Sequence, residues 1–355
     1  MCRARQFALA ELKALAKRAP EAVVATEGAV VAILRVVEKL SPGDQEMEDA
    51  NVEALQDALE CLGCLMDDVT KGVKSENKHV ENISSAKREK EADDTRGQLV
   101  AELVVKHSQN GKQLLRLLSA GETATQYDAM LLLQKIYRRL PEPVDSAILA
   151  DPGSLGQLMH ILQSSPIDYV RNESLGLLLL ITESNTDIQT IVTVQGFIEA
   201  IFTLLEEEDL TAGGKVAKDL LQCLINVVGN TTCQKYLRET NGAASIVNAI
   251  SLAITGRPAE EEEEEDEERL VTDSRWACLG MLVDAALLLA KTEEANRLAL
   301  VRAGALELLR HLAQNLEEAQ LRLVQLFEAL EPCPQAAERL QTYSRSSTLF
   351  SANLA

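Results

Sequence analysis

The stretch YVRNESLGLLLLITESNTDIQTIVTVQGFIEAIFTLL, residues 169–205, decides the fold. Its first part predicts a long helix that Asn185 ends, because apolar residues recur there at the three- and four-residue spacing of one helix face, at Val170, Leu175, Leu178 and Leu179. A short helix around Ile188–Val192 follows, Gly196 breaks it, and Phe197–Leu205 forms the next helix. Glycine suits such a break because it adopts the positive φ of a helix C-cap.

The same unit recurs along the chain, each time as a glycine followed by an amphipathic helix. Gly111, Gly153, Gly196 and Gly242 follow one another at intervals of 42, 43 and 46 residues. Repeats of roughly 40–47 residues are typical of the armadillo/HEAT class, and no convincing alternating strand interrupts them. The sequence therefore predicts an all-α fold, a right-handed superhelical solenoid of armadillo/HEAT type with repeats of 42–46 residues.

Two polar stretches interrupt the repeats. We expect one solenoid over residues 1–340, with a flexible polar insert at 71–96, an acidic insert at 256–272 and a disordered tail at 341–355. Both inserts hold too few apolar residues to bury, so they are predicted to be loops. Trp276 is expected to open a helix after the second insert.

Charge argues against several kinds of partner. The chain has 35 basic and 55 acidic residues, a formal net charge of -20, so it repels phosphate backbones and we expect no nucleic acid partner. The nine-residue acidic run Glu260–Glu268 is either a solvated loop or a segment that attracts a basic partner by its charge. The longest apolar stretch, Leu175–Ile181, is too short to cross a bilayer, which predicts no direct membrane insertion.

The chemistry-bearing motifs favour structural roles. Cys61 and Cys64 form a CxxC without a second pair, so they are predicted to be core thiols rather than a zinc site. The four histidines are dispersed, and Gly213-Gly214-Lys215 lacks the spacing of a phosphate-binding loop. We therefore expect no catalytic, cofactor-binding or metal-binding residues, no cofactor and no enzyme activity. Seven scattered cysteines indicate a reducing cytoplasmic setting.

Four polar residues are the candidates for a partner-binding surface: Arg171, Asn172, Asn226 and Asn230. They occupy repeated places on long helices. The alternative is that asparagine at these places caps helices and ties adjacent turns together.

The residues after Tyr169 carry a specific resemblance. The order of an Arg-Asn-acidic helix start, a Gly-Gly loop and an Asn-rich turn before Gln is seen in Val170–Glu173, Gly213-Gly214, Asn226, Asn230 and Gln234. This order resembles the armadillo-like head of the general vesicular transport factor family, the long tethering proteins of traffic from the endoplasmic reticulum to the Golgi. The likeness runs from about Glu11 to Leu312 and is strongest from Pro141 to Gly242.

The resemblance implies a protein-interaction scaffold for ER-to-Golgi or intra-Golgi transport, cytoplasmic and peripherally recruited to Golgi and transport-vesicle membranes. The implied partners are a Rab GTPase, golgins, a multisubunit tethering complex and SNARE proteins, and a homodimer is left open. The chain looks like the N-terminal half of such a head, without the family's coiled coil.

An alternative is another armadillo-type adaptor, either importin-like or a phosphatase or chaperone scaffold. The importin-like reading predicts a ladder of Trp and Asn, which Trp276 alone cannot make.

Overall fold

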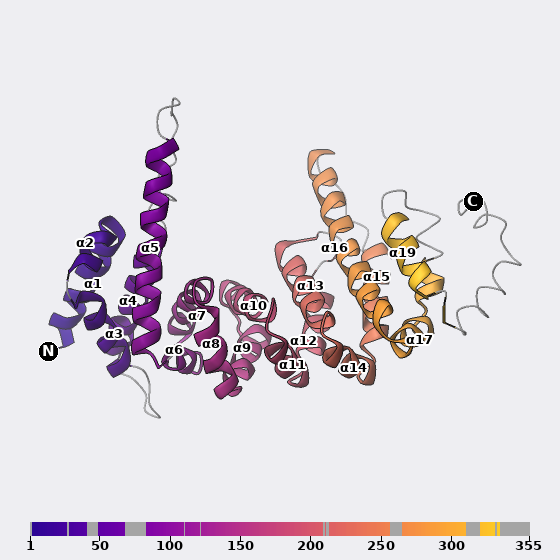
Figure 1. The fold of residues 1–355 in the computed structure, drawn as a ribbon, viewed down its shortest axis with the longest axis horizontal. Helices are drawn as coiled ribbons and strands as arrows, with labels where there is room; N and C mark the ends of the chain where they lie inside the picture. Colours follow the sequence, from indigo (N-terminus) through magenta and orange to yellow (C-terminus); the bar gives the residue numbers. More distant parts are fainter. Residues whose placement is uncertain are drawn as a thin grey trace, which may run out of the picture. The chain divides into compact units, whose positions relative to one another are not determined.

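The computed structural model describes residues 2–26, 28–40, 49–67, 83–109, 111–120, 122–208, 210, 213–255, 265–309, 320–330 and 332–333. Every regular element within these ranges is a helix (Figure 1). The predicted all-α class is therefore confirmed. Its physical basis is a composition rich in residues that lose little freedom in a helix and poor in the aromatic residues that strands favour.

The chain divides into two compact units, Met1–Ile181 and Thr182–Ala355, called here the N-terminal and C-terminal units. The helices of the N-terminal unit are α1 (Cys2–Arg18), α2 (Pro20–Ala25), α3 (Ala29–Leu40), α4 (Asp49–Leu65), α5 (Ile83–His107), α6 (Lys112–Leu117), α7 (Thr123–Tyr137), α8 (Pro141–Ala150), α9 (Gly153–Ser164) and α10 (Asp168–Thr182), whose last residue belongs to the other unit. The C-terminal unit holds α11 (Thr186–Val194), α12 (Phe197–Glu207), α13 (Lys215–Val228), α14 (Thr231–Glu239), α15 (Gly242–Thr255), α16 (Glu265–Thr292), α17 (Glu294–Arg302) and α19 (Gln320–Leu330). Whether one solenoid spans residues 1–340 stays a prediction.

The helices form triplets whose third helix is the longest, as predicted, except in α5–α7, where α5 includes part of the polar insert. We call α4, α7, α10, α13 and α16 the third helices, because each completes such a triplet. In the N-terminal unit α4 packs against both α1 and α7, and in the C-terminal unit α13 packs against α16. The third helices α4 and α7, and likewise α13 and α16, are thus stacked on each other, as expected of units that cannot bury their apolar faces alone.

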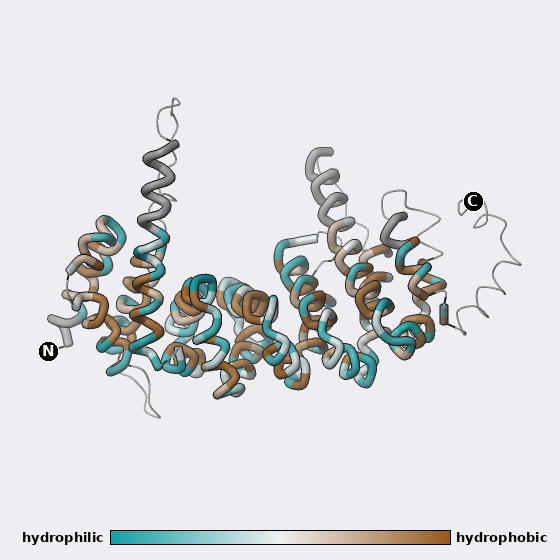
Figure 2. Tube along the Cα trace, in the orientation of Figure 1, coloured by the Kyte–Doolittle hydropathy of each residue, from teal (hydrophilic) through white to brown (hydrophobic). Residues whose placement is uncertain are grey.

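The core consists of the apolar faces that the sequence pattern predicts. In α13 the residues with no exposed area are Ala217, Leu220, Leu221, Cys223, Leu224, Val227 and Val228. Figure 2 shows apolar and polar residues mixed along the described helices, as expected of helices with one buried face.

The glycines at the repeat junctions act in two different ways. Gly196 has a φ of 90° and serves as the N-cap of α12, which confirms the predicted left-handed break. At the next junction the left-handed residue is Asn241, with a φ of 62°. Gly242 is required there for space, because a Cβ on it would lie 2.5 Å from Leu237 Cγ.

Asn185 was predicted to end the long helix, and its position is different. Helix α10 ends at Thr182, and Asn185 is the N-cap of α11. Its side-chain oxygen accepts hydrogen bonds from the backbone N–H groups of Asp187, at 3.1 Å, and Ile188, at 3.0 Å. Asparagine is favoured at this position because the first N–H groups of a helix have no partner within the helix.

Both predicted inserts contain more helix than expected. The loop predicted at 71–96 becomes helix α5 from Ile83 onward, and the loop predicted at 256–272 becomes helix α16 from Glu265 onward. The reason is local propensity, since residues 83–96 include Ala, Lys, Arg and Glu and residues 265–272 are rich in Glu, and these residue types form helices with little apolar content. Trp276 accordingly lies inside α16 rather than opening a helix. Residues 71–82, 256–264 and 341–355 lie outside the described residues.

A helix needs about 20 apolar residues to cross a bilayer. Within the described ranges no single helix is long and apolar enough to do so. One pair, α11 and α12, meets at a bend of 72° and passes the test jointly, by length and composition alone.

The core predicts the effect of a cavity in a third helix. We expect Leu224→Ala to lower the free energy of unfolding by about 2–5 kcal/mol, because it removes a fully buried side chain. The matched control is Lys235→Ala on the exposed side of α14, with an expected change within about 0.5 kcal/mol. Urea unfolding followed by circular dichroism measures both, and equal changes would contradict the packing described here.

Candidate functional site

Arg171 and Asn172, two of the predicted partner residues, lie in the first turns of α10 in the N-terminal unit. Arg171 donates to the carboxylate of Asp168 at 2.8 Å, and the Asp168 side chain is 84% exposed. An ion pair this exposed adds little to stability. Asn172 is exposed as well. Both side chains face solvent, where a partner can reach them.

Asn230, in the C-terminal unit, has the structural role that was the alternative. It is the N-cap of α14, and its side-chain oxygen accepts from the backbone N–H of Thr232 at 3.0 Å. Its amide donates to the Thr186 carbonyl at 3.0 Å and to the Thr190 hydroxyl at 3.3 Å. Asn230 therefore ties the start of α14 to α11 in the preceding repeat.

Asn226 is half-buried on α13, in the same unit. Its amide lies 3.4 Å from the Thr182 hydroxyl, and its oxygen accepts from the Gln222 amide at 3.1 Å. These contacts also connect repeats. A role for Asn226 in partner binding stays a prediction.

The C-terminal ends of the third helices are capped by side chains whose role was not predicted from the sequence. Gln189 is buried in α11 and donates to the carbonyl of Thr182, the last residue of α10, at 2.8 Å. Gln234 is buried in α14 and donates to the carbonyl of Val228, the last residue of α13, at 2.8 Å. Each glutamine follows its helix N-cap by four residues. This four-residue spacing is the sequence pattern from which the role of the two glutamines could have been predicted.

The next repeat uses a different side chain for the same purpose. Arg297 stands four residues after Glu293, the N-cap of α17, and donates to the Ala290 carbonyl near the end of α16 at 3.2 Å. The last carbonyls of a helix have no partner within the helix, so an unbonded buried one is costly. A side chain from the following helix is the common solution in these three repeats.

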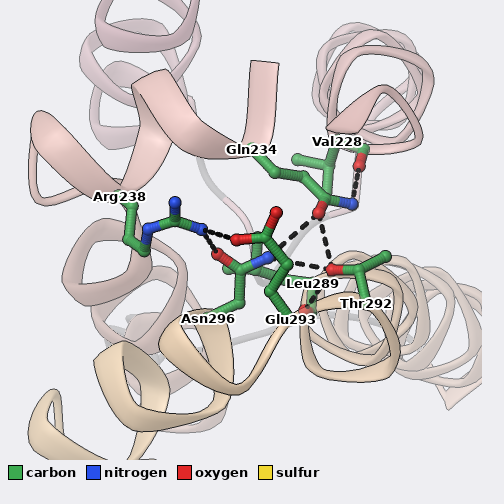
Figure 3. A network of polar contacts seen from close by, with 7 residues as sticks. All are labelled: Val228, Gln234, Arg238, Leu289, Thr292, Glu293 and Asn296. Carbon is green, nitrogen blue, oxygen red and sulfur yellow. Dashed lines mark hydrogen bonds and ion pairs between the residues drawn. The ribbon is translucent and has the colours of Figure 1, made fainter. Parts of the chain in front are cut away.

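Gln234 also belongs to a larger polar network between α14 and the α16–α17 junction (Figure 3). Its side-chain oxygen accepts from the Thr292 hydroxyl at 2.6 Å and from the Asn296 amide at 3.0 Å. Arg238 donates to the side-chain oxygen of Asn296 and, at 2.8 Å, to the carboxylate of Glu293. Asn296 has no exposed area, so its hydrogen bonds lie out of contact with water. The network joins the repeats on either side of the acidic run.

This network predicts a position-dependent loss of stability. We expect Asn296→Ala to lower the free energy of unfolding by about 2–3 kcal/mol, because the buried oxygen of Gln234 and the Arg238 guanidinium each lose a partner. Glu293→Ala is the control, with an expected loss below about 1 kcal/mol, since the Glu293 side chain is 53% exposed. Equal losses in urea unfolding would mean that the buried bonds add nothing.

In the N-terminal unit, cationic side chains close the end of α4. Lys135 of α7 donates to the Gly63 carbonyl at 3.0 Å and pairs with Asp67 at 2.7 Å. Arg139 donates to the Met66 carbonyl at 3.1 Å. Cations suit this position because the C-terminal end of a helix carries partial negative charge.

Arg96 of α5 also donates hydrogen bonds at the C-terminal end of α4. It is 6% exposed and donates to the Leu65 carbonyl at 3.1 Å and to the Asp67 carbonyl at 2.5 Å. Arg96 was predicted to be the last residue of a flexible loop, and the structure corrects that prediction. The cost of burying the Arg96 charge is offset by its hydrogen bonds to the carbonyl groups at the end of α4.

The two cysteines of the CxxC differ in burial. Cys61 has no exposed area, and burial raises the pKa of its thiol to about 12, so it is an unreactive core thiol as predicted. Cys64 is half-buried, and burial raises its pKa as well. Within the described residues no group of His, Cys, Asp or Glu is arranged to hold a metal ion. His79 and His311 lie outside those residues.

Next to Arg171 and Asn172 lies an aromatic pair that sequence reasoning also missed. Tyr169 of α10 and Tyr127 of α7 have ring centroids 5.1 Å apart at an interplanar angle of 86°. Tyr169 is 54% exposed. A large exposed ring beside polar residues is typical of interfaces, where tyrosine is enriched.

The residue after Tyr127 is a poorly solvated carboxylate. Burial raises the pKa of Asp128 to about 6, and the nearby Glu60 carboxylate adds to the effect. Because this pKa is higher in the folded protein than the usual 3.8, the charged form destabilises the fold above pH 6, and the destabilisation fades as the pH falls toward 3.8. A group that costs stability is a candidate for function.

Asp128→Asn should therefore stabilise the protein. We expect a gain of about 1 kcal/mol at pH 7.5, less than the full shift implies because the side chain is partly solvated. The gain should shrink at pH 4.5, where the wild-type carboxyl is largely protonated. Urea unfolding at the two pH values measures it, and a loss of stability at pH 7.5 would show that the carboxylate is not strained by burial.

Solved structures with the same fold include natural and designed proteins. A crystal structure of Uso1 matches 93% of this chain and 50% of its own, with a TM-score of 0.73 and 18% identity. A designed armadillo repeat protein, solved in complex with the peptide (KR)4, matches 84% of this chain and 99% of its own, with a TM-score of 0.55 and 17% identity. These matches confirm the predicted armadillo-type solenoid class.

Several curated relatives are transport proteins by name. The general vesicular transport factor p115 of Homo sapiens is 30% identical over 166 residues, 44% of this chain. The intracellular protein transport protein USO1 of Saccharomyces cerevisiae is 22% identical over 260 residues, 71% of this chain. The chain is similar to the vesicular transport factors. The resemblance inferred from the residues after Tyr169 is thereby confirmed, and no family model matches the chain.

The match to the vesicular transport factors is partial in length. The chain spans 17% of the human transport factor and 14% of the yeast protein. The chain is 30% identical to golgin candidate 6 of Arabidopsis thaliana over 122 residues and spans 13% of the length of that protein. Several residues that carry the transport-factor resemblance, among them Asn230 and Gln234, hold repeats together in this chain.

Proposed function

We propose that this chain is a protein-interaction scaffold in vesicular transport, equivalent to the head of a vesicle-tethering factor in ER-to-Golgi or intra-Golgi transport. The single observation that carries the proposal is the joint match to Uso1: the fold agrees over 93% of this chain, and curated relatives of the same name are transport proteins. A fold alone would name no function.

The arrangement of polar groups supports a scaffold. The buried side chains of Gln189 and Gln234 bond to neighbouring helices, while Asn172 and Tyr169 are exposed on α10 and Arg171 is partly exposed there. Rigid repeats with exposed residues on their long helices suit recognition of folded or extended protein segments. The proposal includes no catalytic step.

The proposed setting is the cytoplasmic face of Golgi and transport-vesicle membranes, with peripheral recruitment through protein partners. By resemblance these partners are a Rab GTPase, golgins, a tethering complex and SNARE proteins. The formal net charge of -20 supports recruitment by proteins over direct binding to anionic lipid, which would repel so acidic a chain.

A paired capture experiment tests the function. The tagged chain, expressed in cells, should locate to Golgi membranes and retain Golgi trafficking proteins after affinity capture. Arg171→Glu combined with Asn172→Arg should reduce that capture severalfold, because the charge of a partly exposed and of an exposed side chain on α10 changes. Lys235→Glu on α14 is the matched control and should retain it. Recovery of nuclear cargo without Golgi trafficking proteins would support an importin-like adaptor and contradict the proposal.

A further inference from the structure

The aromatic pair Tyr127–Tyr169 is only partly covered by the packing of the repeats. Tyr169 contributes its ring edge-on to Tyr127 but leaves 54% of its surface in water. Exposing so large a ring is unfavourable for an unbound protein. The pair joins the surfaces of two successive third helices, α7 and α10.

Two carboxylates flank this pair. Asp128 follows Tyr127 on α7, and Glu173 stands one helical turn after Tyr169 on α10, so that it lies on the same helix face. Burial raises the pKa of the Tyr127 hydroxyl, and the negative charges of Glu173 and Asp128 raise it further. The negative charges of both carboxylates therefore act on the Tyr127 hydroxyl.

Glu173 is held in place by the preceding repeat. Gln134 of α7 donates to its carboxylate oxygen at 2.7 Å and to its backbone carbonyl at 3.1 Å. A neutral amide donor fixes the position of the carboxylate and leaves its negative charge in place. The orientation of the carboxylate is thus set before any partner arrives.

The cation nearest to Asp128 is engaged elsewhere. Lys13 of α1 bonds to Asp57 of α4 and lies 3.0 Å from the Glu60 carboxylate. Asp57 and Glu60 both act on Asp128 as like charges, and Lys13 only partly offsets them. The two acidic side chains of α4 thus add to the negative charge around Asp128.

We propose that the Tyr127–Tyr169 pair, flanked by Asp128 and Glu173, is a docking site for an arginine side chain on a partner protein. A guanidinium plane stacks on a tyrosine ring, and its weak hydration makes its transfer onto a half-buried aromatic surface easier than that of an ammonium group. Its donors reach carboxylates on either side of a ring, which a compact ammonium does not do. The aromatic surface and the charge thus favour the same occupant. The site does not depend on a role in vesicle transport.

Binding of defined peptides to the full chain tests this site. The probes are three dye-labelled peptides of the same length, in which glycine alternates with arginine, lysine or the neutral isostere citrulline, measured by fluorescence anisotropy. We expect the arginine peptide to bind about fivefold or more tightly than the lysine peptide, and the citrulline peptide not to bind. Equal affinity for arginine and lysine, or no binding of the arginine peptide, would overturn the proposal.

Two substitutions of one exposed residue locate the site. Tyr169→Ala should weaken binding of the arginine peptide about tenfold, whereas Tyr169→Phe, which keeps the ring, should stay within about twofold of the wild type. Both variants are expected to fold, because Tyr169 is largely exposed. Tyr236→Ala in the C-terminal unit is the control for non-specific attraction to an acidic protein and should leave binding unchanged. An unchanged affinity in Tyr169→Ala would place the peptide elsewhere and refute the site.

Discussion

The carbonyl groups at the C-terminal ends of the third helices impose the constraint on which the repeats depend. A helix leaves its last carbonyls unpaired, and in a stacked array these groups are removed from water by the next helix. Gln189 and Gln234 satisfy them in two successive repeats, and Arg297 does so in a third. In the N-terminal unit Arg96, Lys135 and Arg139 do the same for α4. Each of these bonds crosses between helices, so satisfying the carbonyl also sets the packing.

This constraint separates residues that hold the fold from residues that remain for a partner. Asn230 was a candidate recognition residue in the sequence, but its polar atoms, like those of Gln234, bond to neighbouring helices. Tyr169 and Asn172 make no comparable contribution to the joints between repeats and stay exposed. The vesicular transport factors resemble this chain partly through the first kind of residue, so similarity of sequence there is evidence for a shared scaffold more than for a shared binding face.

Much of the fold was predictable from periodicity, and the reasons for the failures are physical. The apolar spacing of α10 to α15 and the glycine break at Gly196 follow from helix geometry alone, and both are confirmed. The inserts were predicted to be loops for want of apolar residues, but helix propensity acts without burial, so α5 and α16 extend into them. Asn241, and not Gly242, takes the left-handed conformation. The steric need for a glycine at position 242 was not predictable, because it depends on the position of the Leu237 side chain, which no local pattern reveals.

The candidate site was less predictable, because it depends on which third helices meet. Arg171 and Asn172 were recognisable as polar residues at a helix start, but the Tyr127–Tyr169 contact joins residues 42 positions apart and requires the register of α7 against α10. The most direct test of the account places a photo-crosslinking amino acid at position 172 or at position 230 of the chain in cells. The account predicts crosslinks to Golgi trafficking proteins from position 172 and few or none from position 230. Crosslinks to those proteins from position 230 alone would contradict it.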